Sequence, residues 1–336
     1  MIPQPFNDIS RKVLDGERIT RAEALALLRR PEAEVDSWLD RMDEVRRKHH
    51  GKRVSFCSIV NAQAGGCSEN CSFCAQSGHH KTDSPVYKLL PVEQVLKAAA
   101  EASGNGANRF GVVIASKGLA YEPEAYVEQV LEMIRAIKAQ GRIVPDASLG
   151  ILDERTILRL KEAGLEGLNH NIETSRRFFP SICTTHTFDE RLETIRLAKK
   201  HGLFVCSGGI VGMGETDEDR VDLAFTLRDL DVDTSPLNFL IGVHGTPLAL
   251  REALSPEKCL QITAVFRLVL PEIDLRVCGG RQQCVGDRQA DLYRAGATSV
   301  LMGNYLTRPG TEPEEDLAMV AAQGLDVERF KPLLPR

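Results

Sequence analysis

The sequence predicts an α/β fold, a (β/α)8 barrel of the TIM type with an N-terminal helical extension. Short apolar runs alternate with amphipathic stretches of helical spacing from residue 54 onward. The alternation repeats eight times over about 250 residues, the usual size of such a barrel. The segments after the runs are polar, glycine-rich or cysteine-rich, as loops around one site at a barrel end would be. An open, doubly wound sheet is the alternative, because periodicity does not give the order of the strands.

Each part of the predicted fold has its own signal in the chain. Residues 1–50 should form the helical extension, because RAEALALLRR and EAEVDSWLDRMDEVRRKHH have apolar residues at helical spacing and charge partners four residues apart. Residues 51–310 should form the barrel, and its helical segments, such as DERTILRLKEAG, often end in glycine. Residues 311–336 should form a polar C-terminal tail with a short helix. The expected strands are 54–60, 109–115, 143–149, 167–171, 203–208, 235–241, 275–278 and 299–303.

The composition excludes several classes of protein. Of the 336 residues, 43% are hydrophobic and 26% are charged, unlike a disordered or fibrous chain. No apolar run approaches the roughly 18 residues of a membrane span. The N-terminus lacks the apolar core of a signal peptide, so we expect a cytoplasmic protein without a membrane partner. The net charge of -5 gives no reason to expect a nucleic-acid partner.

The nine cysteines point to metal binding or catalysis, because disulfides are disfavoured in the cytosol. Cys67, Cys71 and Cys74 form a C-x3-C-x2-C motif after the first expected strand, where three thiolates can converge. Structural zinc needs four ligands, and His79 or His80 could supply the fourth. A four-iron cluster on three thiolates would instead leave one iron open to another ligand.

The cysteine triplet, with Phe73 directly before its third cysteine, resembles the signature of radical S-adenosylmethionine enzymes. In that family the open iron of a [4Fe-4S] cluster binds S-adenosylmethionine, which is cleaved to a 5′-deoxyadenosyl radical. The cofactor supplies the difficult chemistry, and the protein supplies placement and exclusion of water. Longer segments resemble the biotin synthases in the same order, over roughly residues 50–310. These segments are GCSENCSFCAQS, LNHNIETS, VCSGGIVGMGET, PLNFLIGVHGTPL and RVCGGRQ.

The resemblance implies a reaction, its cofactors and its partners. The reaction would be radical insertion of sulfur into dethiobiotin to form biotin. The partners would be dethiobiotin, a reducing electron-transfer protein and a second copy of the chain in a homodimer. Cys67, Cys71 and Cys74 would hold the cluster, with Phe73 as part of the cofactor site.

The same resemblance assigns residues to S-adenosylmethionine and dethiobiotin. Asn171 and Glu173 would hydrogen-bond the ribose, and Arg191 would pair with the methionine carboxylate. The backbone at 209–212 would pass close to the adenine, where small residues permit the approach. The residues assigned there are Gly209, Ile210 and Gly212. The residues assigned to dethiobiotin are Asn169, Asn171 and Asn238 at its ureido ring, whose donors and acceptors suit amide side chains, and Arg276, which would also be catalytic.

The chain departs from the usual biotin synthases at the position of their second cluster. That [2Fe-2S] cluster has three cysteine ligands and one arginine, and the matching positions here are Gly111, Asp146, Cys206 and Arg276. Glycine cannot ligate iron, and a hard carboxylate is a poor replacement for a thiolate. The usual site therefore cannot form unchanged.

Other cysteines suggest a differently ligated auxiliary iron–sulfur cluster that donates the sulfur. Cys57, Cys183 and Cys206 are the first expected ligands, Cys278 is the next, and Arg276 should lie close by. The segments SFCSIVNAQ and HHKT resemble a second, anaerobe-associated type of biotin synthase. Cys259, within a helical segment, is expected to be a small buried side chain without a ligand role. For Cys284 the sequence favours neither a packing role nor a ligand role.

Three alternatives differ in class. Another enzyme similar to biotin synthase, such as a mutase or a cofactor maturase, would keep the radical chemistry and change the substrate. An iron–sulfur carrier would use the triplet without a nucleoside pocket. A zinc-stabilised barrel would use the triplet for structure alone.

Overall fold

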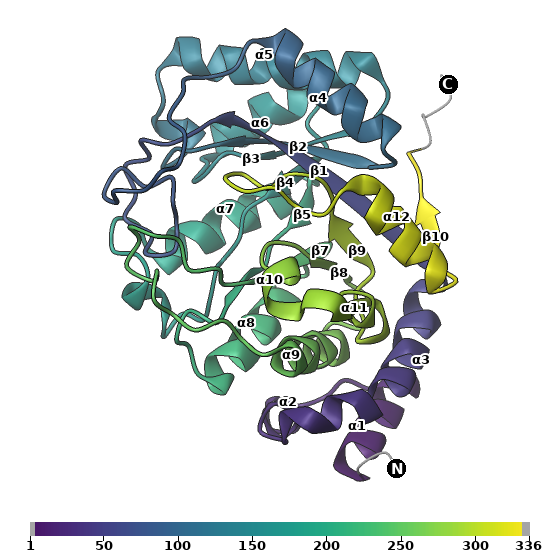
Figure 1. Ribbon diagram of the computed structural model, residues 1–336. Coiled ribbons are helices and arrows are strands. Elements are labelled where there is room, and N and C mark those ends of the chain that lie inside the picture. Colours follow the sequence, from purple (N-terminus) through teal and green to yellow (C-terminus); the bar gives the residue numbers. More distant parts are fainter. Residues whose placement is uncertain (1–3, 331–336) are drawn as a thin grey trace.

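The predicted barrel is confirmed, and it is closed. The computed structural model describes residues 4–330 and shows parallel strands arranged in a ring (Figure 1). β9 pairs with β1, for example through Ser55 and Ser299, and this pairing excludes the open sheet. The barrel strands, in order around the ring, are β1 (Arg53–Gln63), β2 (Arg109–Ile114), β3 (Val144–Ser148), β4 (Gly167–Asn169), β5 (Phe204–Cys206), β7 (Thr234–Phe239), β8 (Asp274–Val277) and β9 (Ser299–Leu301).

Two strands differ from the sequence-based expectation. The fifth expected strand, 203–208, is interrupted, and the chain resumes as β6 (Gly209–Val211), which pairs with β7 and with no other strand of residues 4–330. The chain passes close to β7 at this interruption, because a Cβ atom at Gly208 would lie 1.8 Å from the carbonyl oxygen of Pro236. In the C-terminal segment, β10 (Asp326–Glu328) adds to the N-terminal half of β1, which the sequence did not predict.

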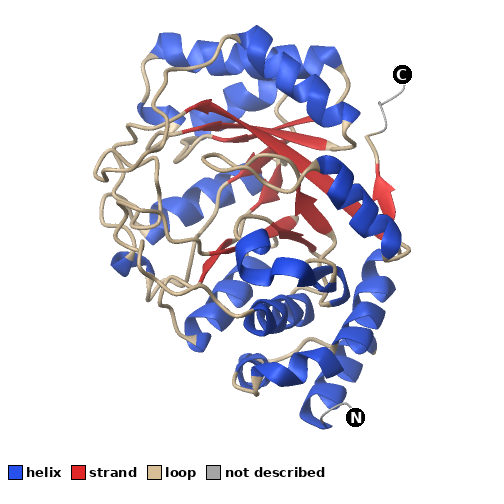
Figure 2. Ribbon diagram, in the orientation of Figure 1, coloured by secondary structure: helices blue, strands red, loops and turns tan. Residues whose placement is uncertain are grey.

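Helices form a layer outside the strands, as Figure 2 shows. Those in the barrel repeat are α4 (Val92–Gly104), α5 (Glu124–Gln140), α6 (Glu154–Glu162), α7 (Phe188–Lys200), α8 (Asp217–Asp229) and α9 (Pro256–Val269). Thr187 and Thr216 form capping boxes with Glu190 and Asp219, and these fix where α7 and α8 begin after the loops of β4 and β6. Shorter helices are η2 (Leu119–Tyr121), η3 (Phe179–Ser181), α10 (Arg281–Val285), η4 (Gly286–Arg288), α11 (Asp291–Arg294) and α12 (Pro313–Ala322).

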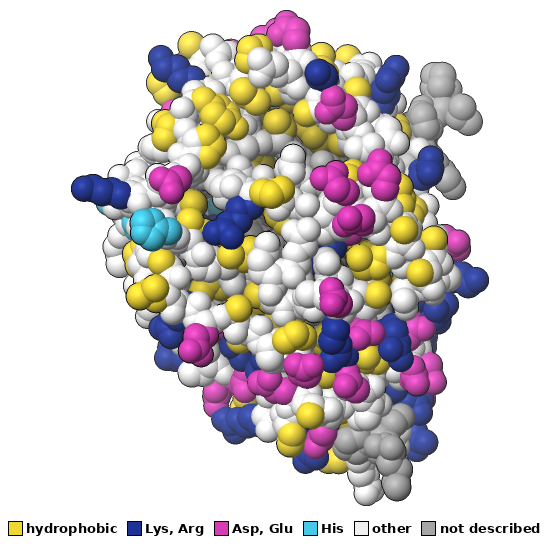
Figure 3. All heavy atoms as spheres, in the orientation of Figure 1, with side chains coloured by type: hydrophobic (Ala, Val, Ile, Leu, Met, Phe, Trp, Pro, Cys, Tyr) yellow, Lys and Arg dark blue, Asp and Glu magenta, His cyan; other side chains and the backbone are white. Residues whose placement is uncertain are grey.

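The segment before β1 is helical, consisting of α1 (Gln4–Leu14), α2 (Arg21–Leu28), η1 (Glu32–Ser37) and α3 (Leu39–His50). Phe6 stacks on the fully buried Trp38 with ring centroids 4.6 Å apart, and α2 packs against α8 and α9. None of the helices in residues 4–330 combines the length and the apolar character that crossing a bilayer requires. On the face in Figure 3, acidic and basic side chains are intermixed.

Candidate functional site

The cysteine triplet lies in the loop that follows β1, at the end of the barrel where the strands terminate. The amide of Cys67 donates to the carbonyl of Gln76 (3.1 Å), and the amide of Cys74 donates to the carbonyl of Cys71 (3.0 Å). These bonds fold the loop back on itself. Burial raises the pKa of Cys67 to about 11, and the nearby Cys74 adds to the effect. Thiols that oppose one another's ionisation in this way form a donor set suited to a cationic metal centre.

A second loop, between β4 and α7, holds the triplet loop in place. Asn70 donates from Nδ2 to the Thr184 hydroxyl (2.7 Å) and accepts at Oδ1 from the Thr184 amide (2.9 Å). The amide of Ser72 donates to the carbonyl of Ile182 (2.8 Å). The two loops therefore form one wall of the site.

His79 and His80 have other partners than the cysteine thiols. His79 Nε2 lies 2.9 Å from the carbonyl oxygen of Ser68, and His80 Nε2 lies 3.0 Å from that of Cys71. Both imidazoles thus brace the backbone of the loop. This arrangement disfavours a zinc site completed by either histidine.

Cys183 lies beside the triplet, and this placement corrects its expected grouping with Cys57 and Cys206. Its Sγ is 3.7 Å from Sγ of Cys71 and 3.3 Å from Nδ1 of His186. The loop between β4 and α7 contacts the loop after β1, so Cys183 faces Cys71 of that loop. The hydrogen bond from Cys71, together with the one to His186, lowers the pKa of Cys183 to about 3.

A polar network around His186 extends from Cys183 to Arg191. His186 Nδ1 pairs with the carboxylate of Glu69, and Arg191 Nε donates to His186 Nε2 (2.9 Å). Arg191 also donates from Nη1 to the carbonyl of Asn171 (2.7 Å). Glu69 and His186 were not among the site residues predicted from the sequence. Their signal was weak, since His186 stands one residue before a helix N-cap and Glu69 stands within the cysteine motif.

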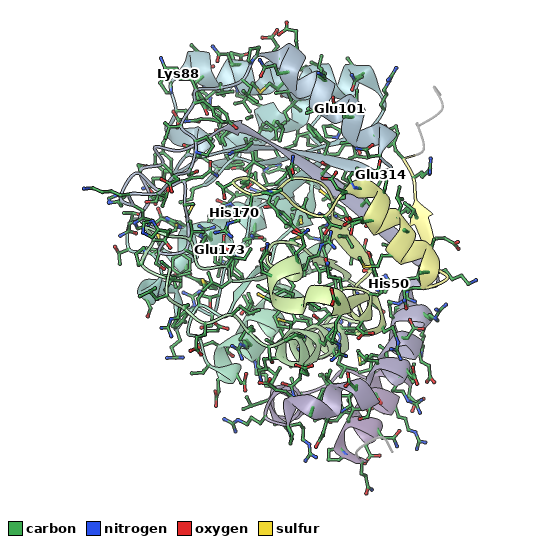
Figure 4. All side chains as sticks on the ribbon, viewed as in Figure 1. His50, Lys88, Glu101, His170, Glu173 and Glu314 are labelled. Atoms are coloured by element: carbon green, nitrogen blue, oxygen red, sulfur yellow. The ribbon has the colours of Figure 1, made fainter. Side chains whose placement is uncertain are left out.

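Two buried polar atoms on the segment after β4 have no hydrogen-bond partner among the described residues. They are Oε2 of Glu173 and Nε2 of His170. Burial raises the pKa of Glu173 and lowers that of His170 well below its usual value. Figure 4 shows both residues on the same side of the molecule. A free carboxylate oxygen suits a ligand that offers hydroxyl donors, such as the ribose assigned to Glu173.

The backbone around Glu173 is closely packed against β6. Glu173 has a φ of 67° and forms an isolated bridge with Gly209. A Cβ atom at Gly209 would lie 2.2 Å from the carbonyl oxygen of Glu173, so this position requires glycine. Gly212 has a φ of 97° and lines a cavity of about 390 Å³ together with Leu254. Ile210 in β6 is half-buried, as is Phe73 in the triplet loop.

The three asparagines assigned to dethiobiotin also have partners in the protein. Asn169 donates from Nδ2 to Sγ of Cys206 (3.2 Å), and Asn171 accepts at Oδ1 from the amide of Gly208 (3.1 Å). Asn238 donates to the carbonyl of Gly209 (3.1 Å) and accepts from the amide of Gly279 (3.0 Å). An amide has two N–H groups and two lone pairs on oxygen, so each side chain keeps capacity for a ligand.

A second group of cysteines lies inside the barrel, and we call it the cysteine chamber. It consists of Cys57, Cys206 and Cys278 around Arg276, all of them buried. Arg276 donates from Nη1 to Sγ of Cys206 (3.5 Å) and from Nε to the hydroxyl of Ser299 (2.8 Å). Burial by itself lowers the pKa of Arg276, but the three thiols and the nearby Asp146 carboxylate together outweigh it and raise the pKa above its usual value. Burial raises the pKa of Cys57 to about 11.

The two positions without cysteine have other roles in the chamber. The Asp146 carboxylate accepts from Nε and Nη2 of Arg109, at 2.7 and 2.6 Å. Gly111 is packed closely, since a Cβ atom there would lie 3.2 Å from Ile59. Asp146 is therefore engaged in an ion pair at the place where a cysteine ligand would stand.

The remaining cysteines, Cys259 in α9 and Cys284 in α10, lie elsewhere and interact with each other. Cys284 also donates from Sγ to the carbonyl of Leu240 (3.7 Å). Both are buried, in agreement with a packing role for Cys259.

Comparison with known proteins gives matches over nearly the whole chain. Residues 64–227 match the model of the radical SAM superfamily, and residues 236–326 match that of the biotin and thiamin synthesis associated domain. A protein of Trichlorobacter lovleyi described as biotin synthase is 44% identical to this chain, over 97% of both chains. A protein of Geobacter sulfurreducens with the same description is 43% identical, over 98% of this chain and 99% of the relative. In Pelotomaculum thermopropionicum the identity is 46%, covering 96% of this chain and 99% of the relative.

Solved structures support the fold. Methylornithine synthase superposes with a TM-score of 0.83 at 20% identity, covering 96% of this chain and 97% of its own. A maturase of the [FeFe]-hydrogenase superposes with a TM-score of 0.81 at 16% identity, covering 98% of this chain and 77% of its own. The sequence matches are much stronger, and they show that the chain belongs to the biotin synthase family of radical SAM proteins.

Proposed function

We propose that this protein is a biotin synthase, which inserts sulfur into dethiobiotin by a radical reaction dependent on S-adenosylmethionine. The observation that carries the proposal is the joint presence of two cysteine groups at different depths of one barrel. The triplet lies at the mouth next to Glu173, whose Oε1 pairs with Arg191 and whose Oε2 has no partner among the described residues, and the cysteine chamber lies below. A substrate held between them would face a radical source on one side and a sulfur source on the other.

The residues at the mouth fit a site-differentiated cluster and its nucleoside. A [4Fe-4S] cluster on Cys67, Cys71 and Cys74 would supply the electron that cleaves S-adenosylmethionine to methionine and a 5′-deoxyadenosyl radical. Arg191 would bind the methionine carboxylate, because His186 and the carbonyl of Asn171 already orient its guanidinium.

Glu173 would accept from the ribose hydroxyls through Oε2, its unpartnered oxygen. Asn171 would assist it from the same segment. Gly209, Ile210 and Gly212 would present backbone to the adenine. The unpartnered acceptor supports an enzyme over an electron carrier, because a carrier has no use for a buried acceptor without a ligand.

For the auxiliary cluster, we propose Cys57, Cys206 and Cys278 as ligands, with Arg276 beside them. This set replaces the earlier one that included Cys183. Arg276 would balance the negative charge of a thiolate-bound cluster, as it already donates to Sγ of Cys206. Asn169 touches Cys206 and could still bind the ureido ring, so it would place dethiobiotin directly above the chamber.

The reducing electron-transfer partner and the homodimer are further parts of this proposal. We also propose a cytoplasmic location, because the nine cysteines are free thiols and a reducing compartment would keep them so.

The test is an anaerobic single-enzyme assay. The protein is reconstituted with iron and sulfide and mixed with dithionite, S-adenosylmethionine and dethiobiotin, and the products are identified by mass spectrometry. We expect biotin together with 5′-deoxyadenosine, and we expect neither from Cys71→Ala. Formation of deoxyadenosine without biotin would refute the assignment of dethiobiotin as substrate or of the auxiliary cluster as sulfur source. Absence of both products, from protein with a full cluster, would refute the assignment as a radical enzyme.

A further inference from the structure

A large cavity opens at the end of the barrel opposite the predicted nucleoside site. Its volume is about 1150 Å³. Figure 4 places His50, one of its lining residues, on the other side of the molecule from His170 and Glu173. The lining comes from α3 and from the starts of several strands, including β10. Among the lining residues are Ser55, Asn108, Arg109, Val144, Phe204 and Arg276.

The floor of this cavity is also the floor of the cysteine chamber. Arg276 lines the cavity and donates to Sγ of Cys206 (3.5 Å). Ser55 lines it too, and its hydroxyl donates to Ser299 (2.8 Å), which accepts from Arg276. Arg109 also lines the cavity, and its guanidinium donates to the carboxylate of Asp146 in the chamber. One layer of polar side chains therefore separates the cavity from the thiols.

The charges in this layer favour a small anion at the floor. Near the rim, Arg53 pairs with Asp274 and Glu328, so that its charge is compensated. Arg276 differs, because among residues 4–330 it forms no ion pair with a carboxylate and its hydrogen bonds go to a hydroxyl and a thiol. Arg276 is 4% exposed, and a guanidinium stays protonated in proteins. A buried cation of this kind attracts an anion that can approach it.

We propose that the cavity is a second entrance to the barrel, through which hydrosulfide reaches Cys57, Cys206 and Cys278 by passing Arg276. This inference rests on the proposed function. If the chamber loses a sulfur atom in each reaction, that atom must be replaced, while S-adenosylmethionine and dethiobiotin fill the other mouth. The step is the passage of HS⁻ with no bond to carbon formed and no electron transferred. Arg276 is long and flexible, so it can guide the anion and close behind it.

The experiment follows isotopic sulfur in the holoenzyme. Enzyme with unlabelled clusters is given S-adenosylmethionine, dithionite, dethiobiotin, ferrous iron and ³⁴S-hydrosulfide. The first biotin formed should contain unlabelled sulfur, and later biotin should contain ³⁴S. Label in the acid-labile sulfide of the protein is measured separately after the first turnover. The test variant is Val144→Trp, which places a large ring in the cavity, and Leu158→Trp on the exposed face of α6 is the matched control.

We expect Val144→Trp to form the first, unlabelled biotin as the wild type does. Its uptake of ³⁴S into protein and into later biotin should fall by about tenfold, the result of a barrier raised by one large side chain. Leu158→Trp should behave as wild type. Asn108→Trp, at another lining position, repeats the test if Val144→Trp does not fold.

Three results would count against these proposals, and each has its own meaning. Equal ³⁴S uptake in both tryptophan variants would overturn the second entrance while leaving the proposed function intact. Absence of biotin from the wild type, with both clusters present, would overturn the proposed function and remove the need for resupply. Slower first turnover in Val144→Trp, in step with slower uptake, would also overturn the inference, because the defect would then be general.

Discussion

At the scale of single residues, Glu173 combines two features that rarely occur together. It has a left-handed backbone, and it buries a carboxylate oxygen that has no partner among the described residues. Both features cost free energy unless a ligand compensates for them. The strain at this position thus supports a binding role.

The first prediction concerns Glu173→Gln, which keeps the shape of the side chain and weakens its acceptor. We expect S-adenosylmethionine to bind about tenfold more weakly, since a hydrogen bond to a charged group contributes about 1.5 kcal/mol or more. Burial raises the pKa of Glu173, so wild-type affinity should fall as the pH decreases through that raised value. In the variant this pH dependence should disappear. Equilibrium binding over a pH series checks both, with Glu101→Gln on the surface as control.

The second prediction separates the two cysteine groups. The Cys183→Ala variant should retain all of the iron that is bound in the barrel interior, because Cys183 lies beside Cys71 and away from the chamber. The double variant Cys57→Ala/Cys206→Ala should lose that iron and keep the triplet cluster. Iron analysis with Mössbauer spectroscopy distinguishes the clusters. Loss of barrel iron in Cys183→Ala would contradict the revised ligand set.

At the scale of elements, two loops decide the geometry of the barrel mouth. The loop after β1 carries the triplet, and the loop between β4 and α7 carries Cys183 and His186. Each is irregular, and each is held by side-chain bonds to the other. Their contact places Cys183 beside Cys71 of the triplet.

The third prediction follows from the contact between these loops. Asn70→Ala removes both bonds to Thr184, which should cost about 1 to 2 kcal/mol of local stability. The triplet cluster should then lose iron faster to a chelator, while barrel iron is released at the wild-type rate. Time-resolved chelation measures this. Asn105→Ala, at an exposed helix C-terminus, is the control, and an equal rate in both variants would show that the loop contact does not matter.

At the scale of the whole molecule, the N-terminal helices and the barrel meet at His50. This residue ends α3, lies 3.0 Å from Nη1 of Arg267 in α9, and has Asp274 of β8 at 3.6 Å. Burial, aided by the Arg267 guanidinium, lowers the pKa of His50 to about 3. His50 is therefore neutral in the folded protein at neutral pH.

The fourth prediction is the pH dependence that this neutral histidine produces. An unfolded histidine has a pKa near about 6.5. Between that value and about 3 the unfolded state binds more protons, so folding stability is present above pH 6.5 and is lost as the pH falls. His50→Gln should lack this contribution. From about pH 6.5 to 5.5, wild type should lose about 1 kcal/mol more than the variant, as measured by urea unfolding. A constant difference would contradict a neutral His50.

Much of the molecule was predictable from local patterns. Hydrophobic periodicity gave the eight repeats, because a strand or helix that must bury one face repeats apolar residues at its own period. The triplet was readable as well, since Cys67, Cys71 and Cys74 are close in sequence and short backbone bonds bring them together. The interruption at Gly208 and the added strand β10 could not be predicted, because both lie against segments that are distant in the sequence.

The sequence by itself determined the repeat, the cysteine motif and the family of the chain. The tertiary structure decided that the sheet closes, that Cys183 faces Cys71, and that Cys57, Cys206 and Cys278 share a chamber with Arg276. It also decided that Glu173 keeps a free acceptor and that a cavity reaches the chamber floor. The physical reason is range: periodicity and motifs depend on neighbours in the chain, whereas closure, loop direction and burial depend on pairings between residues far apart in sequence.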